Sequence, residues 1–140
     1  MKKLIKISFL ALMSMLIINT VNAAEHKLVI QVSTDNARTQ KIALNNAVNL
    51  QKLYGIDNVD IEIVAYGPGL GLLTSKSKQA DRVTSLAMQN ITFNACMNTM
   101  KKVQKKTGKL PQLLEGVNHV TAGVAKIMEL QEQGYAYIRP

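Results

Sequence analysis

The chain has 140 residues and a formal net charge of +8 at pH 7, with 17 Lys and Arg against 9 Asp and Glu. The length suits one domain, and a single cysteine excludes an internal disulfide bond. The basic residues are scattered among acidic ones, and the chain has no Trp and 4% aromatic residues, so its composition gives no support for nucleic-acid binding.

The first 23 residues are predicted to be a secretory signal peptide. Three lysines within the first six residues precede residues 7–21, which carry no charge. This apolar run is shorter than the ~20 residues of a membrane-spanning helix, and it leads to Ala23 through the small-residue pattern that signal peptidase reads. We therefore expect residues 24–140 to form a single domain in the periplasm, free of the membrane after cleavage. An uncleaved N-terminal anchor is the alternative.

Beyond residue 23 the pattern alternates between strands and helices. Residues 28–32 form a nearly unbroken apolar run, as in strands buried on both faces, and residues 37–54 repeat apolar side chains at helical spacing. The other expected strands are residues 59–66, 91–93, 117–120 and 135–138. The other expected helices are residues 75–88, a third helix capped by Asn94, and residues 122–133. This alternation predicts an α/β fold with three α/β/α layers around a five-stranded, mainly parallel sheet.

Ligand sites in such sheets gather beyond the carboxyl ends of the strands. The segments expected at that edge are residues 33–38, 67–74, 94–96 and 119–123. Asn36, Arg38, Asn94 and His119 are candidate binding residues there, although helix capping also explains Asn36. Because His119 shares no ligand spacing with His26 or Cys96, neither a metal site nor a cofactor is expected.

Cys96 is the strongest candidate for chemistry. With Asn94 as the cap, Cys96 is expected to be the second residue of the third helix, close to unpaired N–H groups and the positive end of the helix dipole. That setting favours the thiolate, which attacks disulfides or accepts sulfane sulfur. Packing as a small buried side chain is the alternative. The lack of a second cysteine argues against a thiol oxidoreductase, which resolves its mixed disulfide internally.

Gly67, Gly69 and Gly71 mark a loop after the second strand. Their spacing lacks the three-residue gap of a dinucleotide fingerprint, and no Gly-Lys-Ser/Thr sequence follows. Free backbone N–H groups in such a turn are candidates for binding a small anion. A simple turn, with leucines that pack inward or against a neighbouring subunit, is the alternative.

Several segments together resemble the DsrE/DsrF-like family, most closely an exported branch of it. The segments that carry the resemblance are residues 43–50, 64–70, 93–96, 116–124 and 134–138. The resemblance implies a compact α/β/α domain that assembles into oligomers, often trimers or hexamers. In some relatives, a cysteine at the position that Cys96 matches passes persulfide sulfur between proteins in the cytoplasm.

The residues and the resemblance together predict an exported sulfur carrier that holds persulfide sulfur on Cys96. Such a protein is closer to a carrier than to an enzyme with turnover on a small molecule. The expected partners are further copies of the chain, as a trimer or hexamer, and a protein that donates or accepts sulfur. The alternative is a non-catalytic oligomeric module that recognises a small anion or a partner protein near residues 67–74.

Overall fold

The structure is a computed structural model that describes residues 24–140. The predicted signal peptide lies outside the described residues. Within residues 24–140, no helix has both the length and the apolar character that crossing a membrane requires.

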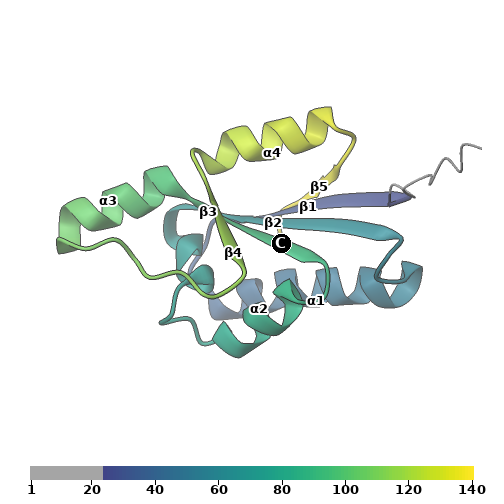
Figure 1. Ribbon diagram of the computed structural model, residues 1–140, viewed down its shortest axis with the longest axis horizontal. Helices are drawn as coiled ribbons and strands as arrows, with labels where there is room; N and C mark the ends of the chain where they lie inside the picture. Colours follow the sequence, from purple (N-terminus) through teal and green to yellow (C-terminus); the bar gives the residue numbers. More distant parts are fainter. Residues whose placement is uncertain (1–23) are drawn as a thin grey trace, which may run out of the picture.

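Five strands alternate with four α-helices and one 3-10 helix (Figure 1). The strands are β1 (His26–Val32), β2 (Val59–Ala65), β3 (Ile91–Cys96), β4 (Val117–Val120) and β5 (Ala136–Ile138). The helices are α1 (Ala37–Tyr54), the 3-10 helix η1 (Gly67–Leu73), α2 (Ala80–Ala87), α3 (Met97–Thr107) and α4 (Gly123–Glu132).

All five strands form one parallel sheet in the order β4-β3-β2-β1-β5. The register aligns Ile30 of β1 with Ile63 of β2 and with Ile138 of β5. The predicted α/β fold with a five-stranded parallel sheet is therefore confirmed. Because the strands are parallel, the segments that follow β1, β2, β3 and β4 all emerge at one edge of the sheet.

Helices cover both faces of the sheet (Figure 1). The larger core lies on the α1 and α2 side, where Leu44 and Val83 are fully buried with Phe93 of β3. The smaller core lies under α4, which crosses the opposite face and packs Ile127 and Leu130 there. Helix α3 extends away from the end of β3 rather than lying across the sheet (Figure 1).

The ends of the helices follow the capping chemistry of the sequence. The side chain of Asn36 accepts a 3.0 Å hydrogen bond from the N–H of Thr39, which confirms the expected cap of α1. Gly55 ends that helix, and its N–H donates back to the carbonyl of Gln51.

Two predicted boundaries were wrong by three residues or more. The third strand continues past Phe93 to Cys96, so Asn94 is a strand residue and not the cap of the third helix. The strand tolerates this asparagine because its amide nitrogen donates a 2.7 Å hydrogen bond to the Glu62 carboxylate of the neighbouring strand. Helix α2 starts at Ala80 instead of residue 75, after turns in which the N–H of Ser77 donates to the carbonyl of Thr74.

Candidate functional site

Cys96 is the last residue of β3 and the N-cap residue of α3. The prediction that it is the second residue of that helix was therefore wrong by two positions. An N-cap side chain lies next to the N–H groups of the second and third helical residues, here Asn98 and Thr99. A sulfur atom thus occupies the place where Ser, Asp or Asn usually accepts a capping hydrogen bond.

A second helix begins beside the same sulfur. Cys96 pairs with Val120 at the end of β4, and α4 starts three residues later at Gly123. The N–H of Asn98 donates a 3.3 Å hydrogen bond to the carbonyl of Thr121, which ties the start of α3 to the segment that leads into α4. Two helix N-termini, both with positive dipole ends, therefore meet around Cys96.

These surroundings lower the pKa of the Cys96 thiol. Burial is the largest single influence and raises the pKa, since only 5% of the residue surface is exposed. Interactions with the N–H groups of Gly123, Thr99 and Asn98, and with the Thr99 hydroxyl, act in the opposite direction and together outweigh burial. The side chain makes no capping hydrogen bond within normal distance and angle limits. The thiolate is thus favoured by several nearby N–H dipoles rather than by one short contact.

The absence of a side chain at Gly123 makes room for Tyr66. A β-carbon at Gly123 would lie 2.9 Å from Cδ1 and 3.2 Å from Cβ of Tyr66, which follows β2 directly. Such a contact is closer than packed atoms tolerate. Glycine therefore allows the first turn of α4 to approach the ends of β2 and β3, and so brings its N–H to the sulfur.

The glycine segment after β2 is a 3-10 helix rather than an open anion-binding loop. The N–H of Gly67 donates a 3.0 Å hydrogen bond to the hydroxyl of Thr99. Gly69 lies against β1, since a β-carbon there would be 2.1 Å from the carbonyl oxygen of Val32. Gly71 has no neighbour within 4 Å of that position. The three glycines thus have different surroundings, and only Gly67 connects to the residues around Cys96.

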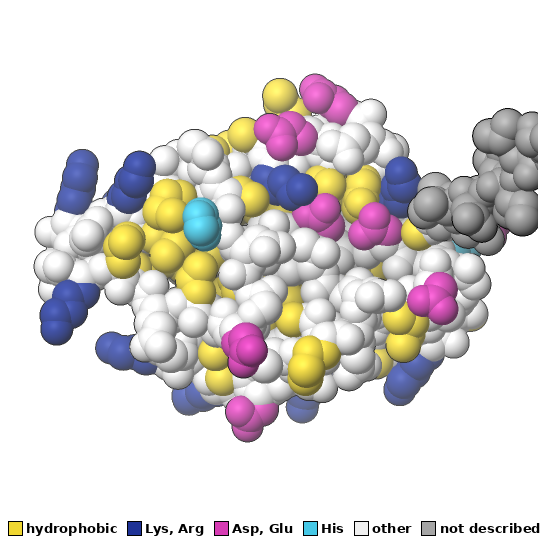
Figure 2. Space-filling view, viewed as in Figure 1, with side chains coloured by type: hydrophobic (Ala, Val, Ile, Leu, Met, Phe, Trp, Pro, Cys, Tyr) yellow, Lys and Arg dark blue, Asp and Glu magenta, His cyan; other side chains and the backbone are white. Residues whose placement is uncertain are grey.

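A polar cluster lies beside the sulfur on the α4 side of the sheet. The Glu62 carboxylate accepts hydrogen bonds from Asn94, at 2.7 Å, and from the ammonium group of Lys126 on α4, at 3.2 Å. Asn94 is 3% exposed, and its side chain is hydrogen-bonded within this cluster. In Figure 2, acidic and basic side chains lie side by side just below α4. Asn94 therefore acts in the structure as a link between β3 and β2.

The chain resembles a solved structure over most of its length. This structure is the protein of unknown function MTH1491 from Methanobacterium thermoautotrophicum, with 33% sequence identity and a TM-score of 0.74. The match covers 82% of this chain and 99% of MTH1491. The chain belongs to the MTH1491 family. No family model matches the sequence, and the search of curated proteins finds no match.

The remaining candidate residues of this MTH1491 family member lie at the same edge of the sheet, and none of them is among the groups that lower the pKa of Cys96. Asn36 caps α1, and Arg38 is exposed on the first turn of that helix. His119 is exposed on the edge strand β4, where it pairs with Ala95. Within residues 24–140, no group of three or more His, Cys, Asp or Glu is arranged to hold a metal ion.

The sequence interpretation missed Thr99, Gly123 and Tyr66. Thr99 was missed because the cap was placed at Asn94: a residue three positions after an N-cap faces the capping atom, and only with Cys96 as the cap is that residue Thr99. Gly123 was expected at the same edge of the sheet, within residues 119–123, but its contact with Cys96 was not expected, because that contact depends on the pairing of β3 with β4.

Proposed function

We propose that this protein is an exported sulfur carrier of the DsrE/DsrF type, with Cys96 as the sulfur acceptor. The observation that carries the proposal is the position of the Cys96 thiol between the first turns of α3 and α4, where its pKa is lowered despite burial. A thiol that only packs the interior has no need of such surroundings, and burial alone would raise its pKa.

The proposed transfer needs no further reactant than a persulfide donor. The Cys96 thiolate attacks the terminal sulfane sulfur of a donor persulfide, a new S–S bond forms at Cys96, and the S–S bond of the donor breaks. The donor leaves as a thiolate, so no net oxidation or reduction takes place. The N–H groups around Cys96 suit both the thiolate and the persulfide anion, since each carries one negative charge.

The donor must reach the thiol of a residue that is 5% exposed. The approach in our proposal runs between Asn98 and Thr121, which are both exposed and flank the starts of the two helices. The backbone hydrogen bond that joins these residues lies on that approach.

The experiment is incubation of the purified protein, from residue 24 onward, with a polysulfide donor, followed by intact-mass measurement. We expect a gain of one sulfur atom that a thiol reductant removes, and no gain in Cys96→Ser. A wild-type protein that gains no sulfur, and whose Cys96 is alkylated no faster than in the urea-unfolded chain at neutral pH, would overturn the proposal.

Export is part of the proposal and is supported by the sequence pattern of residues 1–23. Expression of the full chain in a Gram-negative host, with mass analysis of the periplasmic fraction, tests it. The expected product begins at Ala24. A full-length product retained in the cytoplasm would contradict export and would leave the sulfur chemistry to be tested separately.

Self-association is also part of the proposal. It is supported by the outer face of α4, where Val124 is 67% exposed and Met128, one helical turn later, is 61% exposed. We expect a trimer or hexamer in sedimentation experiments, and a smaller species for Val124→Asn/Met128→Asn. A wild-type monomer would contradict this part.

A further inference from the structure

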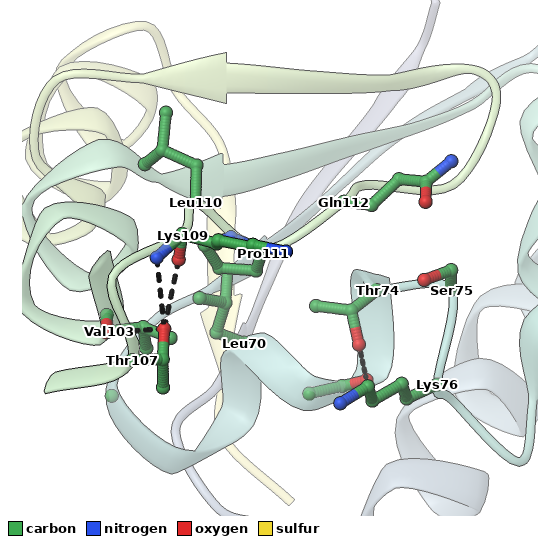
Figure 3. Close-up of a pocket in the computed structure, with 12 residues that line it drawn as sticks. Leu70, Thr74, Ser75, Lys76, Val103, Thr107, Lys109, Leu110, Pro111 and Gln112 are labelled. Carbon is green, nitrogen blue, oxygen red and sulfur yellow. Dashed lines mark hydrogen bonds between the residues drawn. The ribbon is translucent and has the colours of Figure 1, made fainter.

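A cavity of about 510 Å³ lies between η1, the second half of α3 and the segment that follows α3. Figure 3 shows residues that line it. The volume is in the range of small-molecule sites, about 300 to 1,000 Å³. The wall on the α3 side runs from Val103 through the turn at Thr107 to Gln112, and the opposite wall is η1 with residues 74–76.

The walls of this cavity are held together by hydrogen bonds between segments far apart in sequence. The N–H of Ser75 donates to the carbonyl of Gln112 at 3.0 Å, and the N–H of Leu114 donates to the carbonyl of Leu73 at 3.0 Å. The hydroxyl of Thr107 donates to the carbonyl oxygen of Val103 or of Lys109, each at 3.0 Å, and so braces the turn after α3. The cavity is therefore formed before any ligand arrives.

The lining combines apolar surface with two cationic side chains. The apolar part comes from Leu70, Val103, Leu110 and Pro111, and Leu110 keeps 46% of its surface exposed. In Figure 3 the open space lies between Leu70 and Pro111 on one side and Thr74 with Ser75 on the other. The cationic side chains are those of Lys76 and Lys109, one on each wall.

Positive charge also surrounds the cavity. Between residues 67 and 114 the single acidic residue is Asp81. The basic residues of the same segment are Lys76, Lys78, Arg82, Lys101, Lys102, Lys105, Lys106 and Lys109. Figure 2 shows Lys and Arg side chains gathered around the end of the molecule that α3 forms. A local field of this sign attracts anions and repels cations.

We propose that this cavity is a binding site for a small organic anion with an apolar body. The apolar body lies on Leu70 and its aliphatic neighbours, and the anionic group lies within reach of Lys76 and Lys109. An inorganic anion would leave the apolar wall exposed to water, and a neutral ligand would not use the lysines. The site is distinct from Cys96, although Gly67, which lines the cavity, is hydrogen-bonded to Thr99 beside the sulfur.

The test compares hexanoate with hexanamide, which have the same chain and differ in charge. Both are titrated into the ¹⁵N-labelled protein, from residue 24 onward, and followed by amide chemical shifts. We expect hexanoate to shift the signals of Leu70, Gly71, Lys76 and residues 109–112, and to bind roughly five- to tenfold more tightly than hexanamide, as two partly exposed ion pairs allow. Equal affinity, or shifts spread over other surfaces, would overturn the proposal.

Matched variants separate the cavity lysines from general positive charge. Lys76→Gln/Lys109→Gln is expected to reduce hexanoate affinity to that of hexanamide. Lys101→Gln/Lys105→Gln removes the same charge from exposed positions on α3 and is expected to keep most of the hexanoate affinity. Equal losses in the two double variants would reduce the effect to non-specific attraction and refute the site. Cys96→Ser is expected to bind hexanoate normally, so this outcome does not depend on sulfur transfer.

Discussion

A β-carbon on Gly123 would lie 2.9 Å from Cδ1 of Tyr66. This relationship joins the start of α4 to the residue after β2, and it leaves the Gly123 N–H close enough to Cys96 to lower the pKa of the thiol. The pKa of the cysteine is thus tied to the packing of a glycine against an aromatic ring.

Gly123→Ala is expected to displace the first turn of α4 and to raise the pKa of Cys96 toward that of a free thiol. Overpacking of this kind costs about 1–3 kcal/mol of stability. The measurement is the rate of iodoacetamide alkylation between pH 5 and 10. Gly71→Ala is the matched control, because no atom lies within 4 Å of its added β-carbon. An unchanged pH profile in Gly123→Ala would show that the Gly123 N–H has no influence on the sulfur.

The lowered pKa of Cys96 also predicts how stability depends on pH. A thiol with a lower pKa in the folded chain than in the unfolded chain stabilises the fold when it is ionised. That contribution is fully present above the pKa of the unfolded thiol, about 8.5, and is lost as the pH falls through the lower, folded value. Urea unfolding at a series of pH values should therefore show that the free energy of unfolding of the wild type, relative to that of Cys96→Ser, increases with pH. A constant or decreasing difference would contradict it.

Thr99 carries two contacts that Thr99→Val removes together. Its hydroxyl accepts the Gly67 N–H, and it also helps to lower the pKa of Cys96. We expect Thr99→Val to destabilise the protein by about 1–3 kcal/mol, because a partly buried N–H loses its acceptor, and to raise the pKa of Cys96. Thr99→Ser keeps the hydroxyl and should stay near wild type in thermal unfolding and alkylation assays. If both variants behave alike, the hydroxyl has no role.

The Glu62–Lys126 pair should contribute to stability in proportion to its partial burial. The ammonium group lies 3.1 Å from the Glu62 carboxylate, and the two side chains are 12% and 23% exposed for Glu62 and Lys126. Lys126→Met leaves the carboxylate with Asn94 as its remaining partner, and we expect a loss of about 1–2 kcal/mol, less than for a fully buried pair. The double variant Glu62→Gln/Lys126→Met should recover part of that loss in urea unfolding. If the stability losses of Glu62→Gln and Lys126→Met simply add in the double variant, the two residues are not coupled.

The fold could be predicted from the sequence because its signals are local. The apolar run of β1 and the helical spacing of α1 each lie within one segment, and alternation of such segments indicates a parallel sheet. The extension of β3 to Cys96 was not predictable in the same way. It depends on Glu62, 32 residues away, which supplies the acceptor that makes a buried asparagine acceptable in a strand.

The site was predictable only as far as local spacing reaches. Cys96 was identified because it is the single cysteine and lies at a strand–helix junction. Gly123 was placed only at the same edge of the sheet, since its proximity to the sulfur follows from the alignment of β4 with β3. The 3-10 geometry of residues 67–73 also escaped prediction, because Gly69 is shaped by its close approach to Val32 rather than by its own neighbours in sequence.

The pairing of β5 with β1 makes completion of the sheet depend on the end of the chain. Leu28 pairs with Ala136, a residue more than a hundred positions later. Without β5 the outer side of β1 is an open edge, whereas its inner side is paired with β2. A chain that ends after α4 would therefore carry a nearly complete sheet with an unpaired hydrophobic strand at its edge. The three residues of β5 cover that edge, and strand pairing over so long a sequence separation is slow to form.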